Sequence, residues 1–187
     1  MDTQKLLDIL HIAERLKDTP RHCYTTNSRH ESVAEHSWRL CLFAWLLRDE
    51  FPYADMKKVL EMCLIHDLGE AFTGDIPSFE KTDADTRRED ETLLHWVASL
   101  PEPYRTDMTT LYAEMAAQET EEARLYKALD KMEAIIQHNE SPLETWLPLE
   151  YELNMTYANE NVAFSPYLSD LRARILAETK CKIEKGK

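Results

Sequence analysis

The chain has 187 residues, the usual size of one domain and enough to bury a core. Apolar residues make up 43% of it and charged residues 30%, which argues against a disordered chain. The formal net charge of −13 argues against binding to a nucleic acid duplex, because contacts to phosphates need a basic surface. A local pocket can still bind a small anionic substrate.

Glycine is scarce, with 3 residues where average usage of ~7% would supply about 13. This scarcity argues against β-hairpins and glycine-rich phosphate loops, which need positive φ angles or close backbone approach. Two of the three, Gly69 and Gly74, lie within six residues of each other. Unusual backbone geometry is therefore expected in that segment.

The four cysteines show no paired spacing, and Cys41 and Cys63 stand in apolar helical runs, so we expect reduced thiols. No apolar stretch reaches the ~18 residues of a membrane span. The first residues, Met1 to Lys5, precede an amphipathic segment and do not look like a secretory signal. These features predict a cytoplasmic protein that does not contact membranes.

Apolar residues recur at helical spacing along almost the whole chain. A first helix carries Leu6 to Leu16 and ends before Pro20. Ser32 and Glu35 form a capping box that starts a second helix. Further helices are expected over about 55–69, 84–99, 103–118 and 120–139, after a second capping box at Ser141-Pro142-Leu143-Glu144, and after Ser165-Pro166. The pattern predicts a single all-α domain of six to eight helices over residues 1–187.

The dipeptide His66-Asp67 stands at the end of the apolar helix Met62-Cys63-Leu64-Ile65. A carboxylate behind such a run is costly to bury unless a cation or a donor compensates it. Imidazole with carboxylate is a normal ligand set for a divalent transition metal. The alternative is that Asp67 caps the helix end and His66 belongs to the core.

Two further residues favour a metal site. His36 lies in the first turn of the helix that Ser32 caps, so its side chain projects from a rigid mount. Asp130 lies beside the apolar stripe of a later helix, where a carboxylate needs a partner. An ion pair of Asp130 with Lys127 or Lys131 is an alternative that the sequence leaves open.

Taken together, these residues resemble the H…HD…D signature of the HD-domain metal-dependent phosphohydrolases, and most closely the bacterial 5′-deoxynucleotidases. The resemblance rests on residues 31–37 (ESVAEHS), 66–77 (HDLGEAFTGDIP) and Asp130-Lys131. The motifs span about residues 21–131, and residues 142–185 carry no recognised motif. The resemblance implies a helical fold and the release of phosphate from deoxyribonucleoside 5′-monophosphates.

The resemblance also implies that His36, His66, Asp67 and Asp130 hold one divalent ion. Four protein ligands leave positions for water and a phosphate oxygen, as hydrolysis requires. Members of the superfamily with two metals carry additional histidines between the HD pair and the final aspartate, and here only His95 lies in that interval, so the resemblance favours a single ion. Mixed nitrogen and oxygen ligands admit Mn, Co, Fe, Ni or Zn.

The segment after the HD pair is expected to carry the catalytic acids. Glu70 follows Asp67 by three residues, so on a helical turn the two carboxyl groups share a face, next to metal-bound water. The resemblance assigns Glu70 and Asp75 to catalysis, and Asp75, Ile76, Pro77 and Ser78 to contact with the nucleotide. The alternative for each acid is a solvated loop residue.

The resemblance places a phosphate-orienting arginine at Arg21, because arginine grips phosphate in a bidentate way. The family pattern has tryptophan at the next position, as a wall for the sugar, whereas this chain has His22. His22 can stack on a substrate, but discrimination between deoxyribose and ribose stays open. Arg29 and Arg39 are further phosphate candidates.

Three functions compete at this point. The first is hydrolysis of nucleoside 5′-monophosphates, and the second is hydrolysis of nucleoside di- or triphosphates or of a modified nucleotide. The third is a non-catalytic helical module with a structural metal. A homodimer is also expected, partly because large apolar residues such as Trp146, Leu149 and Tyr167 lie beyond the motif region. The tryptophans Trp38 and Trp45 are expected in the core or at a subunit interface.

Overall fold

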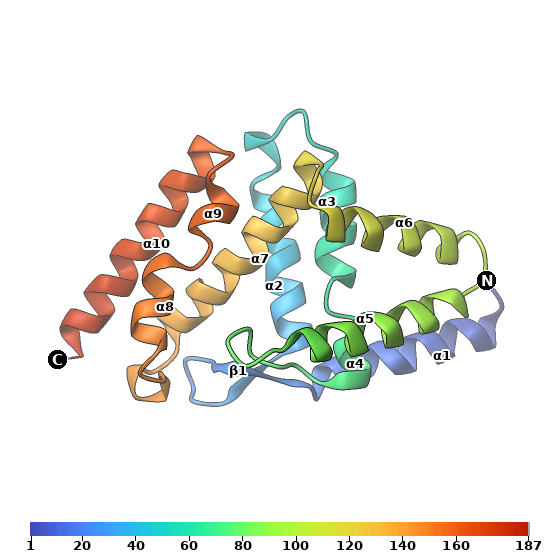
Figure 1. The fold of residues 1–187 in the computed structure, drawn as a ribbon, viewed down its shortest axis with the longest axis horizontal. Helices are drawn as coiled ribbons and strands as arrows, with labels where there is room; N and C mark the ends of the chain where they lie inside the picture. Colours follow the sequence, from blue (N-terminus) through green and yellow to red (C-terminus); the bar gives the residue numbers. More distant parts are fainter. Residues whose placement is uncertain (187) are drawn as a thin grey trace.

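The structure is a computed structural model that describes residues 1–186, in which ten α-helices and one two-stranded sheet form (Figure 1). The helices are α1 (Thr3–Glu14), α2 (Val33–Leu46), α3 (Met56–Ile65), α4 (Glu70–Thr73), α5 (Asp83–Ala98), α6 (Tyr104–Ala117), α7 (Glu121–Glu140), α8 (Glu150–Thr156), α9 (Asn159–Val162) and α10 (Pro166–Lys185). The strands are β1 (Pro20–Tyr24) and β2 (His30–Ser32). Of these helices, α4 and α9 are single turns and the other eight are longer. The predicted all-α fold of six to eight helices is therefore confirmed.

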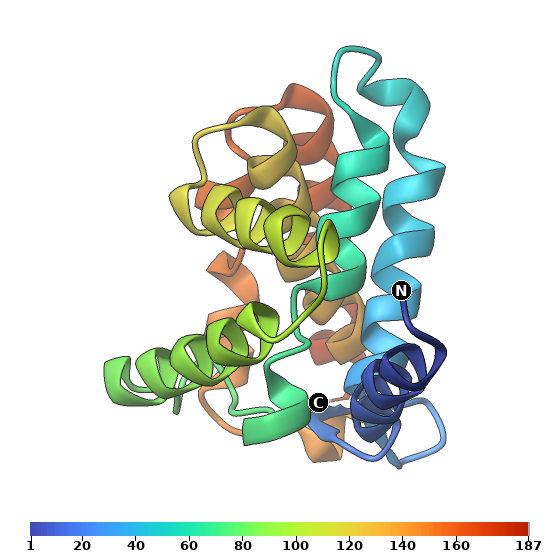
Figure 2. The same cartoon turned by 90° about the vertical axis from the view of Figure 1, so that its right-hand side faces the viewer.

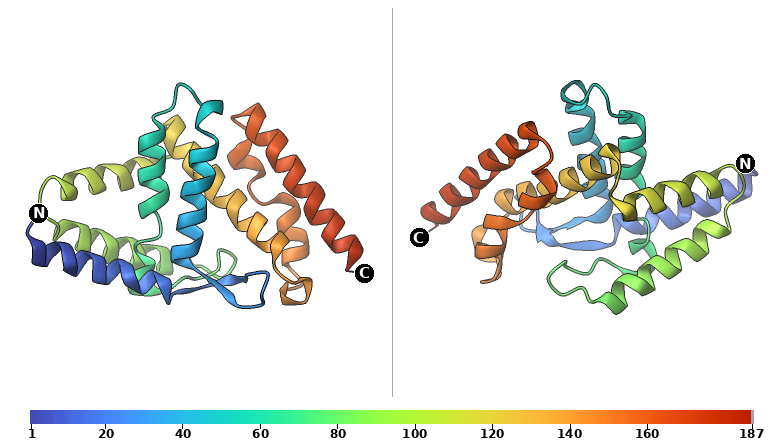
Figure 3. Two further views of the ribbon diagram at one scale, coloured as in Figure 1. Left: turned by 180° about the vertical axis from the view of Figure 1, so that it is seen from behind. Right: turned by 45° about the horizontal axis from the view of Figure 1, so that its top comes forward.

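Helix α7 runs through the centre of the molecule (Figure 1). It packs against α2 and α3, which lie side by side, and against α10 and β1 on other sides (Figures 2 and 3). Its buried apolar residues, among them Leu125, Leu129, Met132 and Ile135, recur every three or four positions and form the middle of the core. Side chains on α7 therefore meet elements from both ends of the chain.

Helix α2 begins as the sequence predicts. The Ser32 hydroxyl accepts a hydrogen bond from the Glu35 N–H at 3.3 Å, and the Glu35 carboxylate accepts one from the Ser32 N–H at 2.9 Å. This capping box fixes the first turn of α2. His36 follows directly and is fully buried.

The hairpin of β1 and β2 contradicts the expectation drawn from the scarcity of glycine. The two strands pair in antiparallel fashion, with an irregular register between Pro20 and Tyr24. Ser28 supplies the positive φ angle of the turn, at 58°, which a non-glycine residue adopts at a modest cost. A single hairpin of this kind does not need glycine.

The second predicted capping box is wrong. Leu143–Thr145 form only a short 3₁₀ turn, and the next α-helix begins at Glu150. Ser141 instead ends α7, because its N–H donates to Gln137 O and its hydroxyl donates to His138 O. The same hydroxyl accepts a hydrogen bond from Trp146 Nε1 at 3.0 Å, so it is committed to the end of α7.

The large apolar residues divide between the core and the surface. Trp146 is buried and Phe164 packs against the core, whereas Leu149 and Tyr167 are 45% and 41% exposed. Trp38 and Trp45 are 67% and 49% exposed on α2, so of the two settings expected for them the core is excluded. In the described part of the chain, no helix is both long and apolar enough to cross a membrane.

Gly74 provides a test of the backbone after α4. Its φ of 77° and ψ of 164° lie in a region that residues with a Cβ rarely adopt, although the space around it is open. We expect Gly74→Ala to lower the free energy of unfolding by about 1–3 kcal/mol through backbone strain alone. Urea denaturation measures this change, and an unchanged midpoint would contradict it.

Candidate metal centre and substrate cavity

Two imidazoles face each other where the first turn of α2 lies beside the end of α3. His36 Nε2 and His66 Nε2 lie 3.2 Å apart. His66 Nδ1 lies 2.9 Å from the carbonyl oxygen of Cys63, one turn earlier, and so must donate its proton there. His36 Nδ1 makes a short hydrogen bond to the Glu133 carboxylate. Both Nδ1 atoms are thus fixed as donors, which leaves lone pairs on the Nε2 atoms of the neutral rings.

Two carboxylates complete the cluster. Asp67 Oδ2 lies 2.9 Å from His66 Nε2 and 3.8 Å from His36 Nε2. Asp130 Oδ1 lies 3.2 Å from His36 Nε2 and 3.7 Å from His66 Nε2. Ligand atoms bound to one ion at ~2.0–2.2 Å lie about 3–3.5 Å from one another, so these separations fit a shared cation.

The two carboxylate oxygens of Asp130 face different partners. One carboxylate oxygen faces the histidines, while the other accepts a hydrogen bond from Lys127 Nζ at 2.8 Å. Burial raises the pKa of Asp130, but Lys127 and a positive charge on His36 outweigh it and hold the pKa well below its usual range. For Asp67, a positive charge on His66 likewise overcomes burial and lowers the pKa to about 2, and a bound cation would supply such a charge while the rings stay neutral. Both carboxylates are therefore ionised at neutral pH.

The cluster forms one end of a cavity of about 250 Å³. Of the eleven residues assigned from the sequence to the metal, to catalysis or to contact with the nucleotide, nine line this cavity: Arg21, His22, Asp67, Glu70, Asp75, Ile76, Pro77, Ser78 and Asp130. The other two, His36 and His66, lie just behind Asp67 and Asp130. The structure thus brings together segments from β1, α7 and the region after α3.

Glu70 stands where the chain turns from α3 into α4. Its N–H donates to Asp67 O at 3.1 Å, so the two residues share one helical turn, as the sequence predicts. Its Oε2 atom is buried and has no hydrogen-bond partner among residues 1–186. Burial, and then the charges of Asp67 and Asp75, raise the pKa of Glu70 to about 10. This crowding of carboxyl groups favours a cation in the cavity.

Two buried glutamates behind the cavity were not predicted. Arg21 Nη1 lies 3.8 Å from Glu31 and 3.7 Å from Glu133, and it makes no direct hydrogen bond in the described chain. Glu133 follows Asp130 by three residues and also binds His36 and Arg39. The one-turn spacing from Asp130 is the signal that could have revealed Glu133.

The opposite end of the cavity holds a second cluster that sequence reasoning missed. Glu150 Oε1 lies 2.7 Å from His138 Nε2 and 3.1 Å from His22 Nε2. The two histidine rings are stacked, with centroids 6.1 Å apart. Nothing in the sequence spacing of these three residues indicates that they meet, because β1, α7 and α8 bring them together.

The remaining arginine candidates are not part of the cavity wall. Arg29 pairs with Glu35 on the surface, and Arg39 pairs with Glu133 and Glu140. Neither side chain lines the cavity. The structure therefore gives no support to Arg29 or Arg39 as a direct phosphate ligand.

Comparison with known proteins defines the class of this fold and site. The sequence profile of the HD domain matches residues 13–171, and the chain belongs to the HD-domain family. The match extends well beyond the motif span of about 21–131 and includes α8, α9 and the start of α10.

Particular relatives agree with the predicted branch. The 5′-deoxynucleotidase HDDC2 of Mus musculus is 32% identical over 139 residues, which are 72% of this chain and 69% of that protein. Its Homo sapiens counterpart is 31% identical over 141 residues, covering 73% and 68%. A protein from Magnetospirillum magnetotacticum MS-1, described as a predicted metal-dependent phosphohydrolase, superimposes with a TM-score of 0.80 at 25% identity, covering 96% and 93%.

The His138–Glu150 pair gives the fold a pH dependence. Burial lowers the pKa of His138, but its hydrogen bonds to Cys23 and Glu150 outweigh burial and raise the pKa to about 10. The charged ring therefore stabilises the fold fully below its ordinary value of 6.5, and this contribution is lost as the pH rises toward 10. We expect the free energy of unfolding to fall more steeply from pH 7 to 10 in the wild type than in His138→Gln. Parallel curves in urea denaturation would contradict this assignment.

Proposed function

We propose that the protein is a metal-dependent phosphohydrolase that releases inorganic phosphate from nucleoside 5′-monophosphates, deoxyribonucleotides among them. The observation that carries the proposal is the convergence of four lone-pair atoms beside a cavity that also presents Arg21 and Glu70. The names of the HDDC2 relatives support the substrate class. The net charge of −13 favours a small molecule over a nucleic acid duplex as the partner.

The proposed ligands of the ion are His36, His66, Asp67 and Asp130. The donor set fits a divalent transition metal, because two neutral imidazoles and two ionised carboxylates converge with no proton donor between them. When bound, such an ion polarises a phosphate oxygen and lowers the pKa of a water molecule. Glu133 and the Cys63 carbonyl hold the two rings in the tautomer that this binding requires.

The remaining groups of the cavity are proposed to act on the substrate directly. Arg21 lines the cavity and is proposed to bind a phosphate oxygen, while Glu31 and Glu133, 3.8 and 3.7 Å from its buried Nη1, keep the guanidinium in place. Glu70 lines the cavity beside Asp67 and is proposed to accept a proton from the attacking water; its raised pKa belongs to the cavity without a cation, and a bound cation would lower it and leave the carboxylate ionised. Asp75 is the second acid, and Ile76, Pro77 and Ser78 contact the nucleoside from the same side.

The first test addresses the metal. Wild-type protein should contain one divalent ion per chain, and Asp67→Ala should lose both the ion and activity because a ligand is removed. Asp49→Ala is the control, since that side chain is exposed and lies outside the cavity. Elemental analysis with phosphate release from a panel of nucleoside mono-, di- and triphosphates measures both effects. Stoichiometric metal in Asp67→Ala would refute the ligand assignment.

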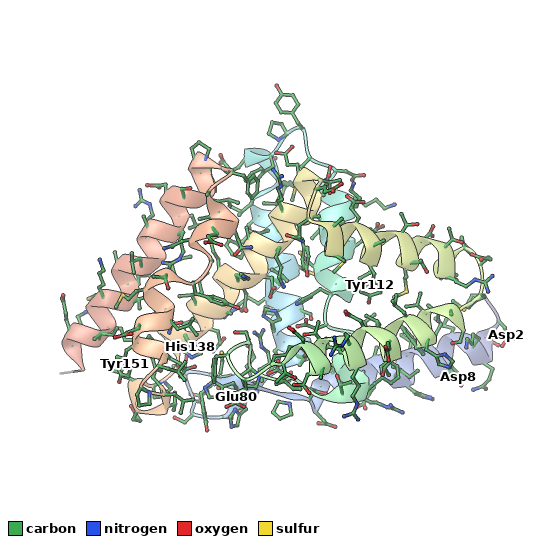
Figure 4. The ribbon with its side chains drawn as sticks, viewed as in Figure 1. Asp2, Asp8, Glu80, Tyr112, His138 and Tyr151 are labelled. Carbon is green, nitrogen blue, oxygen red and sulfur yellow. The ribbon has the colours of Figure 1, made fainter. Side chains whose placement is uncertain are left out.

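The second test separates Glu70 from the ligands. Glu70→Gln should keep the ion and the fold but lower kcat by ~10²–10⁴-fold, the usual contribution of a general base. Substrate affinity should change little, because the phosphate would still be bound by Arg21. The matched control is Glu80→Gln, an exposed glutamate ten residues further on (Figure 4). Near-normal turnover in Glu70→Gln would leave Asp75 as the base.

We also propose that two copies associate through one face of α2. Trp38, Leu42, Trp45 and Leu46 recur at helical spacing on this face and are all 39–67% exposed. A contiguous apolar stripe of this kind is unusual on a monomer, and two-fold dimers are the commonest assembly.

Two further proposals concern location and domain organisation. The unpaired cysteines, three of them buried or half-buried, support a cytoplasmic location. The contacts of α7 with helices from both ends of the chain support one domain over residues 1–187.

Sedimentation equilibrium tests the dimer. The wild type should sediment at twice the chain mass of 21.9 kDa, and Trp38→Glu with Trp45→Glu should restore the mass of one chain by placing charges on the apolar face. Circular dichroism should show unchanged helix content in the double variant. A wild-type mass of one chain at micromolar concentration would disprove the association.

A further inference from the structure

The second cluster, which consists of His22, His138 and Glu150, has the donor set of a metal site. One nitrogen of each ring and one carboxylate oxygen lie within 4.8 Å of one another. Glu150 Oε1 is 2.7 Å from His138 Nε2 and 3.1 Å from His22 Nε2. Two imidazoles and one glutamate are a known ligand set of catalytic zinc sites, in which the fourth position stays open. In Figure 4, His138 lies at the end of α7 that approaches α8.

Two of the three donor groups are anchored through their outer atoms. Glu150 Oε2 accepts a hydrogen bond from the Leu147 N–H, so Oε1 is the oxygen that faces the rings. His138 Nδ1 lies 3.0 Å from Cys23 Sγ, which leaves Nε2 to face Glu150. The ligands of the proposed metal centre at Asp67, here called the Asp67 centre, are held in the same way.

Aromatic packing confines both rings of the second cluster. The His22 ring packs edge-on against Phe79, and the His138 ring packs edge-on against Trp146, with centroids 5.4 Å apart in each pair. The planes of the two histidine rings differ by only 27°. Side chains that are already confined lose little rotamer freedom when they bind an ion.

In the cluster without a cation, a proton supplies the positive charge. Glu150 is 1% exposed, and a carboxylate buried to this degree needs a positive partner. Burial lowers the pKa of His138, but its hydrogen bonds to Cys23 and Glu150 outweigh burial and raise the pKa to about 10. A divalent ion would displace this proton and supply charge to all three groups at once.

All three residues line the substrate cavity of about 250 Å³. An ion bound among them would therefore keep its open position, with a water molecule, inside this cavity. His138 follows Asp130 by eight residues on α7, which corresponds to about 12 Å along the helix axis. Two ions that act together in a hydrolytic reaction lie only ~3.5–4 Å apart. An ion at the second cluster would thus narrow the cavity without joining the reaction at the Asp67 centre.

We propose that His22, His138 and Glu150 form a second binding site for a divalent transition metal, zinc in particular, and that an ion bound there competes with the substrate. The binding is independent of the proposed function, whereas the competition rests on it. The second cluster offers three ligands instead of four and has a proton to displace. We therefore expect purified protein to keep an ion only in the Asp67 centre, and the second site to fill when zinc is added.

Zinc stoichiometry in four proteins tests the site. After dialysis against micromolar zinc chloride, elemental analysis should find two equivalents in the wild type and one each in Asp67→Ala and His138→Gln. The variant with both substitutions should contain none, because each site then lacks a ligand. His11→Gln is the control, since it removes an exposed histidine outside the cavity and should leave two equivalents.

The same measurement separates failure of this inference from failure of the proposed metal centre. As much zinc in His138→Gln as in the wild type would overturn the inference. As much zinc in Asp67→Ala as in the wild type, together with a loss in His138→Gln, would refute the Asp67 centre and support the second site.

Calorimetric titration of zinc into Asp67→Ala measures the second site alone. Adding His22→Gln should weaken the affinity by ~100-fold or more, because a ligand is lost, and this variant replaces His138→Gln if the latter folds poorly. Adding Cys23→Ala, which removes only the partner of His138 Nδ1, should weaken it by about ten-fold. Circular dichroism should show unchanged helix content in each variant. Zinc affinity that His22→Gln leaves unchanged would contradict the ligand assignment.

Inhibition kinetics test the competition. With free zinc set by a metal buffer and a nucleoside 5′-monophosphate as substrate, zinc should raise KM of the wild type and leave kcat unchanged. His138→Gln should need at least ~10-fold more free zinc for the same effect. Inhibition that His138→Gln does not alter would mean that zinc acts at the Asp67 centre, and this part of the proposal would then be wrong.

Discussion

The site depends on four lone-pair atoms that are held close together although they repel one another. The two imidazoles can face each other only because their Nδ1 protons are committed elsewhere, to the Glu133 carboxylate and the Cys63 carbonyl. Lys127 plays the same part for Asp130 by binding the oxygen that faces away. Glu133, the Cys63 carbonyl and Lys127 all belong to helices that pack in the core. The stability of these helices therefore offsets the repulsion between the four lone-pair atoms and holds them in the positions that a cation needs.

Helix α7 connects the anchors to the rest of the molecule. Lys127, Asp130, Glu133 and His138 all stand on it: Lys127 binds Asp130, Glu133 binds His36 and lies near Arg21, and His138 belongs to the far wall of the cavity. The apolar residues between them are the core that α2, α3 and α10 cover. Packing and chemistry therefore share one element, and substitutions in the core of α7 are expected to disturb both.

The sequence predicted most of what is local. The capping box at Ser32, the helical turn that carries Asp67 and Glu70, and the helix from Pro166 all follow from spacing within a few residues. One local prediction is wrong: Ser141 could cap a new helix, but hydrogen bonds with His138 O and Trp146 Nε1 commit its hydroxyl to the end of α7. The parts that the sequence missed are those where a distant residue decides. His22, His138 and Glu150 meet only because three separate elements converge.

The unbroken geometry of α7 has a consequence for which molecules can enter. Its twenty residues contain neither glycine nor proline, so the separation between Asp130 and His138 cannot adjust to the ligand. The opposite side, from Gly74 to Phe79, has no regular structure beyond a turn. The length of a ligand along α7 is therefore limited by a rigid helix, whereas its thickness across the cavity is limited by a segment without helical hydrogen bonds.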